Sequence, residues 1–241
     1  MIDPAAHDFR TRQDRLLRAE GQAMALLARI EAEGLVRPGR SERDVERDIV
    51  DLARDAFGVT THWHKRIVRS GPHGVLISSD NPPPRIIDED DLVWVDLGPV
   101  FEDWEADVGR SYALGGDARK AALVRDLPLV FHALQSRFHA DADATGAALY
   151  ALACREAEAR GWLFGGRIAG HIVSEFAHAR IPGDKEHNRI SPDNPTRLRD
   201  PDGWGREKFW ILEVHLVSPD RSFGGFYERL LPFAPEARPT S

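Results

Sequence analysis

Two kinds of hydrophobic periodicity alternate along the chain. Apolar residues recur three to four positions apart in residues 17–30 and again in residues 45–56. This spacing predicts two amphipathic helices, the first ending near Gly34 and the second beginning after the capping residue Ser41. The segments THWHKRIVRSG and LVWVDLG follow, rich in β-branched and aromatic residues and separated by the turn-forming run SSDNPPPR. They are typical of strands.

The same order then repeats in the second half of the chain. Helical periodicity returns in residues 117–140, across Pro128, and in residues 145–160, up to Gly161. The run 180–208 is dominated by Pro, Gly, Asp, Asn and Arg, which predicts a long surface loop. WILEVHLV and GGFYERLL, joined by SPDRSFG, predict an antiparallel hairpin, and the tail after Pro232 is expected to fray.

This repeated order of helices and strands predicts one α+β domain over residues 1–241. It also suggests two related halves, although the residue identity between them is too weak to count as a sequence repeat.

Charge and composition exclude several kinds of partner. Lys and Arg number 32 against 39 Asp and Glu, a net charge of −7, so nucleic acid and anionic membranes are repelled on average. No run approaches the roughly 18 apolar residues that span a bilayer, and the N-terminus lacks the pattern of a signal peptide. The single cysteine, Cys154, cannot form an internal disulfide. We expect a cytoplasmic protein.

Acidic residues stand where the strand pattern calls for apolar side chains. Alternation places Asp96 on the side of Leu92 and Trp94, and Asp107 follows eleven positions later, close enough for two strands joined by a short turn to bring both carboxylates together. The C-terminal hairpin carries Glu213 and Glu228 in the same way.

Four carboxylates in one apolar face repel each other, and no lysine or arginine lies within those faces to neutralise them. Taken singly, each acid is better explained as an ordinary edge-strand or turn carboxylate in water. Taken together they favour divalent cations, and best a pair about 3.5–4 Å apart that shares carboxylates and activates water. His171, after the glycine-rich run GGRIAG, is a candidate ligand that favours Mn, Fe, Co or Zn.

These segments together resemble the pita-bread metallopeptidases, the family of methionine aminopeptidase, aminopeptidase P, prolidase and creatinase. VDLGPVFEDWEADVGRSYALG resembles the family's first metal-binding hairpin, AGHIVSEFAH its histidine segment, and WILEVHL and GGFYERL its two glutamate segments. The resemblance covers roughly residues 17–231.

The resemblance implies a pita-bread fold, with pseudo-twofold αβ halves around a curved antiparallel sheet, and two divalent metal ions in its concavity. It implies the ligands Asp96, Asp107, His171, Glu213 and Glu228, of which Asp107 and Glu228 bridge the two ions. It also implies catalytic roles for His178, which contacts substrate, and for Glu213, which can relay a proton. The separate N-terminal domain of creatinase, prolidase and aminopeptidase P is expected to be absent.

One family feature is missing from its usual position. A substrate-contacting histidine is expected 17–18 residues before the first aspartate, where this chain has Ser78 and Ser79. His64 and His73 are possible replacements, although a surface or packing role fits each of them better. Aromatic residues near the proposed site are expected mainly to pack the core, with one or two shaping a pocket. They are Trp63, Trp104, Phe176, Trp210, Phe223 and Tyr227.

Three functions are compatible with this sequence. The first is a dinuclear metal-dependent hydrolase, an aminopeptidase or Xaa-Pro-type peptidase acting on short peptides. The second keeps the metals but acts as a hydrolase or lyase on a small amide- or amidine-like molecule, as the missing histidine suggests. The third is a binding module without catalysis, which ranks last because all five ligands are retained. A homodimer is possible in each case.

Overall fold

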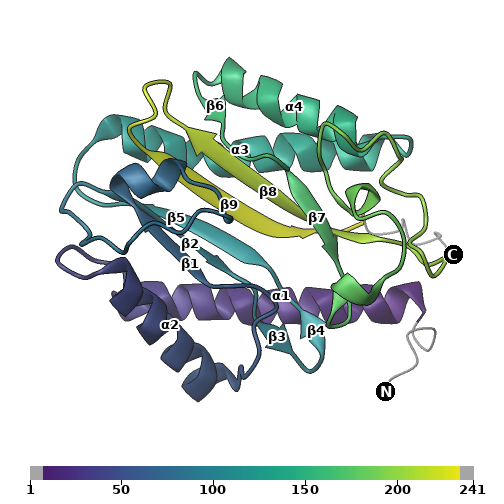
Figure 1. Ribbon diagram of the computed structural model, residues 1–241, viewed down its shortest axis with the longest axis horizontal. Helices are drawn as coiled ribbons and strands as arrows, with labels where there is room; N and C mark the ends of the chain where they lie inside the picture. Colours follow the sequence, from purple (N-terminus) through teal and green to yellow (C-terminus); the bar gives the residue numbers. More distant parts are fainter. Residues whose placement is uncertain (1–7, 234–241) are drawn as a thin grey trace, which may run out of the picture.

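The computed structural model describes residues 8–233 and is built on a seven-stranded antiparallel sheet (Figure 1). The strand order is β1-β2-β5-β9-β8-β6, and β7 pairs with β8 as well, while β3 and β4 form a separate two-stranded hairpin. The strands are β1 (Ile67–Ser70), β2 (Leu92–Leu97), β3 (Val100–Phe101), β4 (Trp104–Glu105), β5 (Val108–Ala113), β6 (Leu163–Phe164), β7 (Gly170–Val173), β8 (Phe209–Val217) and β9 (Gly224–Leu231). The predicted α+β class and C-terminal hairpin are confirmed.

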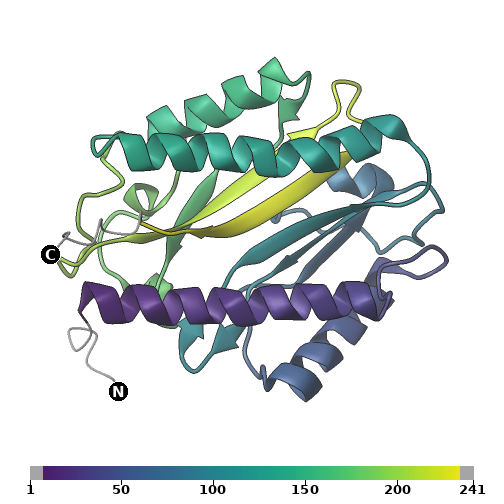
Figure 2. The same cartoon turned by 180° about the vertical axis from the view of Figure 1, so that it is seen from behind.

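Two pairs of helices cover one face of this sheet. They are α1 (Phe9–Ala32), α2 (Glu42–Phe57), α3 (Ala118–Ala140) and α4 (Gly146–Ala159). Figure 2 shows α1 and α3 crossing the same face, with α2 beside α1 and α4 beside α3. Short 3₁₀ turns complete the fold: η1 (Gly71–Val75), η2 (His178–Arg180) and η3 (Glu186–Asn188).

The helix pairs leave the opposite face of the sheet open. Val93, Val95 and Leu97 of β2 pack with α1 and α2, while Leu212 and Val214 of β8 pack with α3 and α4. Because side chains alternate along a strand, the residues between these point to the other side. The acidic residues of β2 and β8 therefore lie on the face opposite these side chains, where η1 accepts hydrogen bonds from Trp94 and His215 through the Gly74 carbonyl.

The predicted helices are confirmed, with one boundary moved. Ser41 caps α2 through the backbone nitrogen of Asp44, as predicted. The first helix begins at Phe9 rather than near Leu17, because its first turns are held by a charged side chain that hydrophobic periodicity does not count. Arg12 is 1% exposed, stacks on the ring of Phe209 and donates to the carbonyl oxygen of Glu207.

One other expectation is wrong. In THWHKRIVRSG only Ile67–Ser70 form a strand, so residues 61–66 are irregular. The run 180–208 is a long irregular segment with many exposed residues, as predicted, but it is anchored: Ile181, Ile190 and Leu198 belong to the core, and the indole nitrogen of Trp210 donates to the Leu198 carbonyl. The tail expected to fray lies, from residue 234 on, outside the described residues. Within residues 8–233, no helix combines the length and the apolar character needed to cross a bilayer.

A buried glutamate at the start of α2 holds the chain that leads into the open face. Glu42 is 4% exposed and accepts from the backbone nitrogen and hydroxyl of Ser70, at 2.7 and 3.0 Å. It also accepts from the ring of His73 at 3.0 Å and from the backbone nitrogen of Arg85 at 3.2 Å. These bonds fix η1 and the approach to β2.

Replacing Glu42 with Ala should lower the free energy of unfolding by about 2–3 kcal/mol, because it leaves several buried donors without an acceptor. Urea denaturation followed by circular dichroism measures this. The control is Glu46→Ala, one turn later on α2, whose pairing with Arg66 at 3.4 Å is partly exposed and should be worth less than about 1 kcal/mol. Equal losses in the two variants would contradict the anchoring role.

Candidate metal centre

A row of acidic side chains crosses the open face of the sheet. Asp96 of β2 lies opposite Gly109 of β5, Gly109 lies opposite Glu228 of β9, and Glu228 lies opposite Glu213 of β8. Directly opposed residues share a face, so the three carboxylates project to the same side. A β-carbon at Gly109 would come within 2.5 Å of the Phe226 ring and 3.0 Å of Glu228 Cβ. The glycine therefore leaves the room that this row needs.

Asp107 and His171 complete the group that the sequence predicts. The Oδ2 atom of Asp107 lies 3.1 Å from Nε2 of His171 on β7, and the same Nε2 lies 3.7 Å from Glu213 Oε1 and 3.9 Å from Glu228 Oε1. Asp107 precedes β5 after the β3–β4 hairpin, instead of the short turn that we expected between the strands. The structure thus brings all five predicted ligands together.

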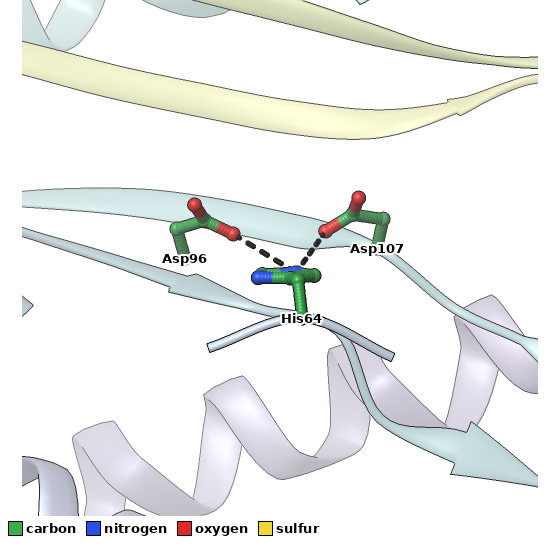
Figure 3. A group of neighbouring side chains, drawn as sticks. All are labelled: His64, Asp96 and Asp107. Atoms are coloured by element: carbon green, nitrogen blue, oxygen red, sulfur yellow. Dashed lines mark hydrogen bonds and ion pairs between the residues drawn. The ribbon is translucent and has the colours of Figure 1, made fainter. Parts of the chain in front are cut away.

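A histidine that the sequence analysis assigned to the surface or the core also reaches the centre. Figure 3 shows the ring of His64 between the carboxylates of Asp96 and Asp107, its backbone on a segment separate from the strands that carry them. Its Nε2 atom lies 3.4 Å from Asp96 Oδ1 and 3.2 Å from Asp107 Oδ1. The packing role holds for His73, which bonds Glu42. Ser78 and Ser79 form a turn after η1.

Both imidazoles are oriented by backbone carbonyl groups. The Nδ1 atom of His64 lies 2.6 Å from the carbonyl oxygen of Lys65, and that of His171 lies 2.8 Å from the carbonyl oxygen of Ile172. In each ring, Nδ1–H donates to the carbonyl, which leaves Nε2 to face the carboxylates. Metal-binding histidines in proteins are commonly oriented in this way.

The second predicted catalytic histidine lies beside the centre and is held by a buried glutamate. The Nδ1 atom of His178 lies 2.8 Å from Oε2 of Glu105, and its backbone nitrogen donates to Oε1 at 2.9 Å. Glu105, on β4, is 1% exposed. The rings of His178 and His171 are stacked, with centroids 5.7 Å apart. Glu105 thus fixes the ring so that its Nε2 is the nitrogen left for a ligand.

One aromatic residue joins the three histidines. The ring of Trp63 packs edge-on against His64, His171 and His178, at centroid distances of 4.4, 5.1 and 4.9 Å. Its indole nitrogen donates to the carbonyl oxygen of Ala106 at 3.2 Å. Trp63 therefore forms part of the site, whereas Trp210 packs in the core, as expected.

Burial and mutual repulsion perturb the carboxylates strongly. Burial raises the pKa of both Asp96 and Glu213 to about 7, and it raises the pKa of Glu228 well above its usual range. Burial acts the same way on Asp107, but His64 and His171 outweigh it and hold its pKa below the usual range. The neighbouring carboxylates overcome the burial of the two rings, raising the pKa of His64 to about 10 and that of His171 to about 9.

The donor atoms fit divalent cations. One nitrogen or oxygen from each of His64, Asp96 and Asp107 lies within 4.8 Å of the others, and the same holds for Asp107, His171 and Glu228. Two buried carboxylate oxygens, Asp96 Oδ1 and Glu228 Oε2, accept no hydrogen bond from any described residue. Buried anionic oxygens without donors are costly unless a cation compensates them. Mixed carboxylate and imidazole donors suit Mn, Fe, Co or Zn.

Comparison with known proteins identifies the family. The family model described as metallopeptidase family M24 matches residues 15–200. The chain belongs to this family. The match includes Asp96, Asp107, His171 and His178 and ends before the strands that carry Glu213 and Glu228. A search of curated proteins finds no match.

Solved structures of the family have the same fold. Methionine aminopeptidase from Thermotoga maritima aligns with a TM-score of 0.69 and 16% identity, over 97% of this chain and 100% of its own. X-Pro aminopeptidase from the same organism aligns with a TM-score of 0.65 and 18% identity, over 93% of this chain and 62% of its own. Xaa-Pro dipeptidase from Bacillus anthracis aligns with a TM-score of 0.66 and 21% identity, over 92% of this chain and 60% of its own. This chain thus spans about three fifths of the latter two. The predicted pita-bread fold is confirmed.

Replacing Glu105 with Ala should lower the free energy of unfolding by about 1–3 kcal/mol, because the backbone nitrogens of Ser174 and His178 lose their buried acceptor. Chemical denaturation measures the loss. The matched control is Glu102→Ala on the same hairpin, whose side chain is 78% exposed in its pair with Arg15 and should cost less than about 0.5 kcal/mol. An unchanged stability of the Glu105 variant would show that these bonds do not hold His178.

Proposed function

We propose that this protein is a metal-dependent peptidase, an aminopeptidase or Xaa-Pro-type peptidase that acts on short peptides. The observation that carries the proposal is the convergence of Asp96, Asp107, His171, Glu213 and Glu228 on one face of the sheet, with His178 stacked beside them. Membership of metallopeptidase family M24 supports the same reaction class. Cytoplasmic location and a homodimer stay predictions.

In this proposal the five residues hold two divalent ions, with Mn, Co, Fe or Zn as candidates. The two oxygens of Asp107 support a bridging role, because Oδ1 faces His64 at 3.2 Å while Oδ2 faces His171 at 3.1 Å. Glu228 is buried beside the same group, as a second bridging carboxylate would be. When bound, such ions polarise a substrate carbonyl group and make water nucleophilic at neutral pH.

The chain's own residues then have separate tasks. His178, fixed through Nδ1 by Glu105, presents Nε2 to the substrate and orients it. Glu213 suits proton transfer, because its side chain is 17% exposed whereas those of Asp107 and Glu228 are 2–3% exposed. Trp63 packs against all three histidines and keeps water away from one side of them.

A non-peptide substrate is the second candidate. Ser78 and Ser79 stand where the family resemblance implies a substrate-contacting histidine, and His64 and Trp63 fill part of the centre from another direction. This difference favours a hydrolase or lyase for a small amide- or amidine-like molecule. A binding module without catalysis is supported least, because the complete donor set is retained.

Replacing His171 with Ala should reduce turnover to below about one hundredth, since the loss of a partner that merely orients a metal ligand already costs 10–100-fold. The assay is a panel of Xaa-Pro dipeptides, peptides with N-terminal Met, and small amides and amidines, each tested with Mn²⁺, Co²⁺, Fe²⁺ and Zn²⁺. His132→Gln, on the exposed side of α3, is the control. Turnover that survives in the His171 variant would refute the proposal, and the hydrolysed compound distinguishes the two candidates.

Removing the metal should destabilise the protein, because the buried carboxylates then repel one another. At an ion concentration of about 100 times Kd, binding adds about 2.7 kcal/mol, which corresponds to a rise in Tm of roughly 5–10 °C for a chain of this size. Thermal denaturation after dialysis against a chelator, with and without added Mn²⁺, measures the shift. Without a shift in the wild type, or with the full shift in His171→Ala, the ions do not bind at this centre.

A further inference from the structure

The geometry around Asp96 points to a sixth metal ligand. We propose that His64 binds the ion on the Asp96 side through Nε2, so that each of the two ions has one imidazole ligand. This inference rests on the proposed metal centre and adds a nitrogen donor to the side on which the family resemblance supplies carboxylates alone.

The distances match those of donors on one ion. Metal–ligand bonds of about 2.1 Å that meet at tetrahedral or octahedral angles place neighbouring donors about 3.0–3.4 Å apart. The Nε2 atom of His64 lies 3.2 Å from Asp107 Oδ1 and 3.4 Å from Asp96 Oδ1, and Nε2 of His171 lies 3.1 Å from Asp107 Oδ2. His64 therefore lies at nearly the same distance from Oδ1 of Asp107 as His171 does from Oδ2.

An unsatisfied oxygen supports the same conclusion. Asp96 Oδ1 is buried and accepts no hydrogen bond from the described residues, although the His64 ring faces it. The side chain of Asp96 is only 10% exposed, so bulk water does not compensate this oxygen. An ion between Asp96 and His64 would satisfy both groups, because a carboxylate oxygen and Nε2 would then each donate an electron pair to it.

The position of His64 is built by three independent features. The carbonyl oxygen of Lys65 holds Nδ1, and Trp63 packs against the edge of the ring. Gly98, directly after β2, leaves the space for it, since a β-carbon there would lie 2.2 Å from His64 Cδ2 and 2.4 Å from Nε2. The neighbouring residues Trp63 and Lys65 thus orient the ring toward Asp96 and Asp107. Gly98, at the end of the strand that carries Asp96, leaves the space that the ring occupies.

The added nitrogen donor should change the choice of metal. A side made of carboxylates alone suits Mg²⁺ or Mn²⁺, whereas an imidazole shifts preference toward Zn²⁺, Co²⁺ and Fe²⁺. Because each side would then have one imidazole ligand, both sides of the centre would prefer the same metals.

The test measures ion binding directly. Wild-type protein, His64→Ala and His62→Gln, a control two residues earlier in the same segment, are titrated with Co²⁺ by equilibrium dialysis and visible absorption. We expect two ions in the wild type and the control. In His64→Ala we expect one ion bound as before, the other at least about tenfold weaker, and an altered cobalt spectrum.

A second variant keeps every donor residue but changes the space around His64. Gly98→Ala should push the ring aside and reproduce the loss of the second ion, while circular dichroism of the metal-free protein shows whether the fold persists. If the wild type binds no ion, the proposed function fails. If it binds two and both variants bind two with unchanged affinity, only the role of His64 is overturned. An unchanged affinity with a raised KM for peptides would overturn it too, by placing His64 on the substrate.

Discussion

The repulsion among four carboxylates, three of them buried, is the constraint on which this structure depends. Asp96, Asp107, Glu213 and Glu228 lie on one face of the sheet with two imidazoles as their nearest positive partners. At an effective dielectric constant near 20, two charges 4 Å apart interact by about 4 kcal/mol, which is comparable with the net stability of a domain. A fold that keeps these groups together has to compensate their charge, by protonation, by the neighbouring imidazoles or by bound cations, and the raised pKa values of three of the carboxylates have the same cause.

The rest of the fold serves to keep that face open yet rigid. Val93, Val95 and Leu97 of β2 share an apolar cluster with α1 and α2, and Leu212 and Val214 of β8 share one with α3 and α4, so these helices stabilise the strands from the side opposite the acids. Glycines make the crowding possible, since Gly109 separates two carboxylates and Gly98 makes room for an imidazole. Buried glutamates hold the surrounding chain, with Glu42 fixing the approach to β2 and Glu105 fixing His178. A side chain at Gly109 would displace Phe226 or Glu228, and one at Gly98 would displace His64.

The sequence predicts the parts of the centre that depend on regular structure. An acid inside a strand pattern has a known face, so the placement of Asp96 and Glu213 follows from alternation alone. His64 escapes this reasoning because it lies in an irregular segment, where periodicity gives no direction. Its only signal is the density of imidazole and indole in HWHK. The buried anchors of the run 180–208 escape this reasoning for a related reason, since side chains such as Ile190 follow no period that would reveal them.

The centre also explains why the order of helices and strands repeats. After α1 and α2 the chain supplies His64, Asp96 and Asp107, and after α3 and α4 it supplies His171, Glu213 and Glu228. Each half thus contributes one imidazole and two carboxylates from the chain that follows its helices. Neither half alone offers enough donors to enclose a pair of ions. Asp107, whose two oxygens face one imidazole each, joins the two sets. The halves lack detectable sequence identity yet share this division of donors, and the charge balance of the shared face depends on both.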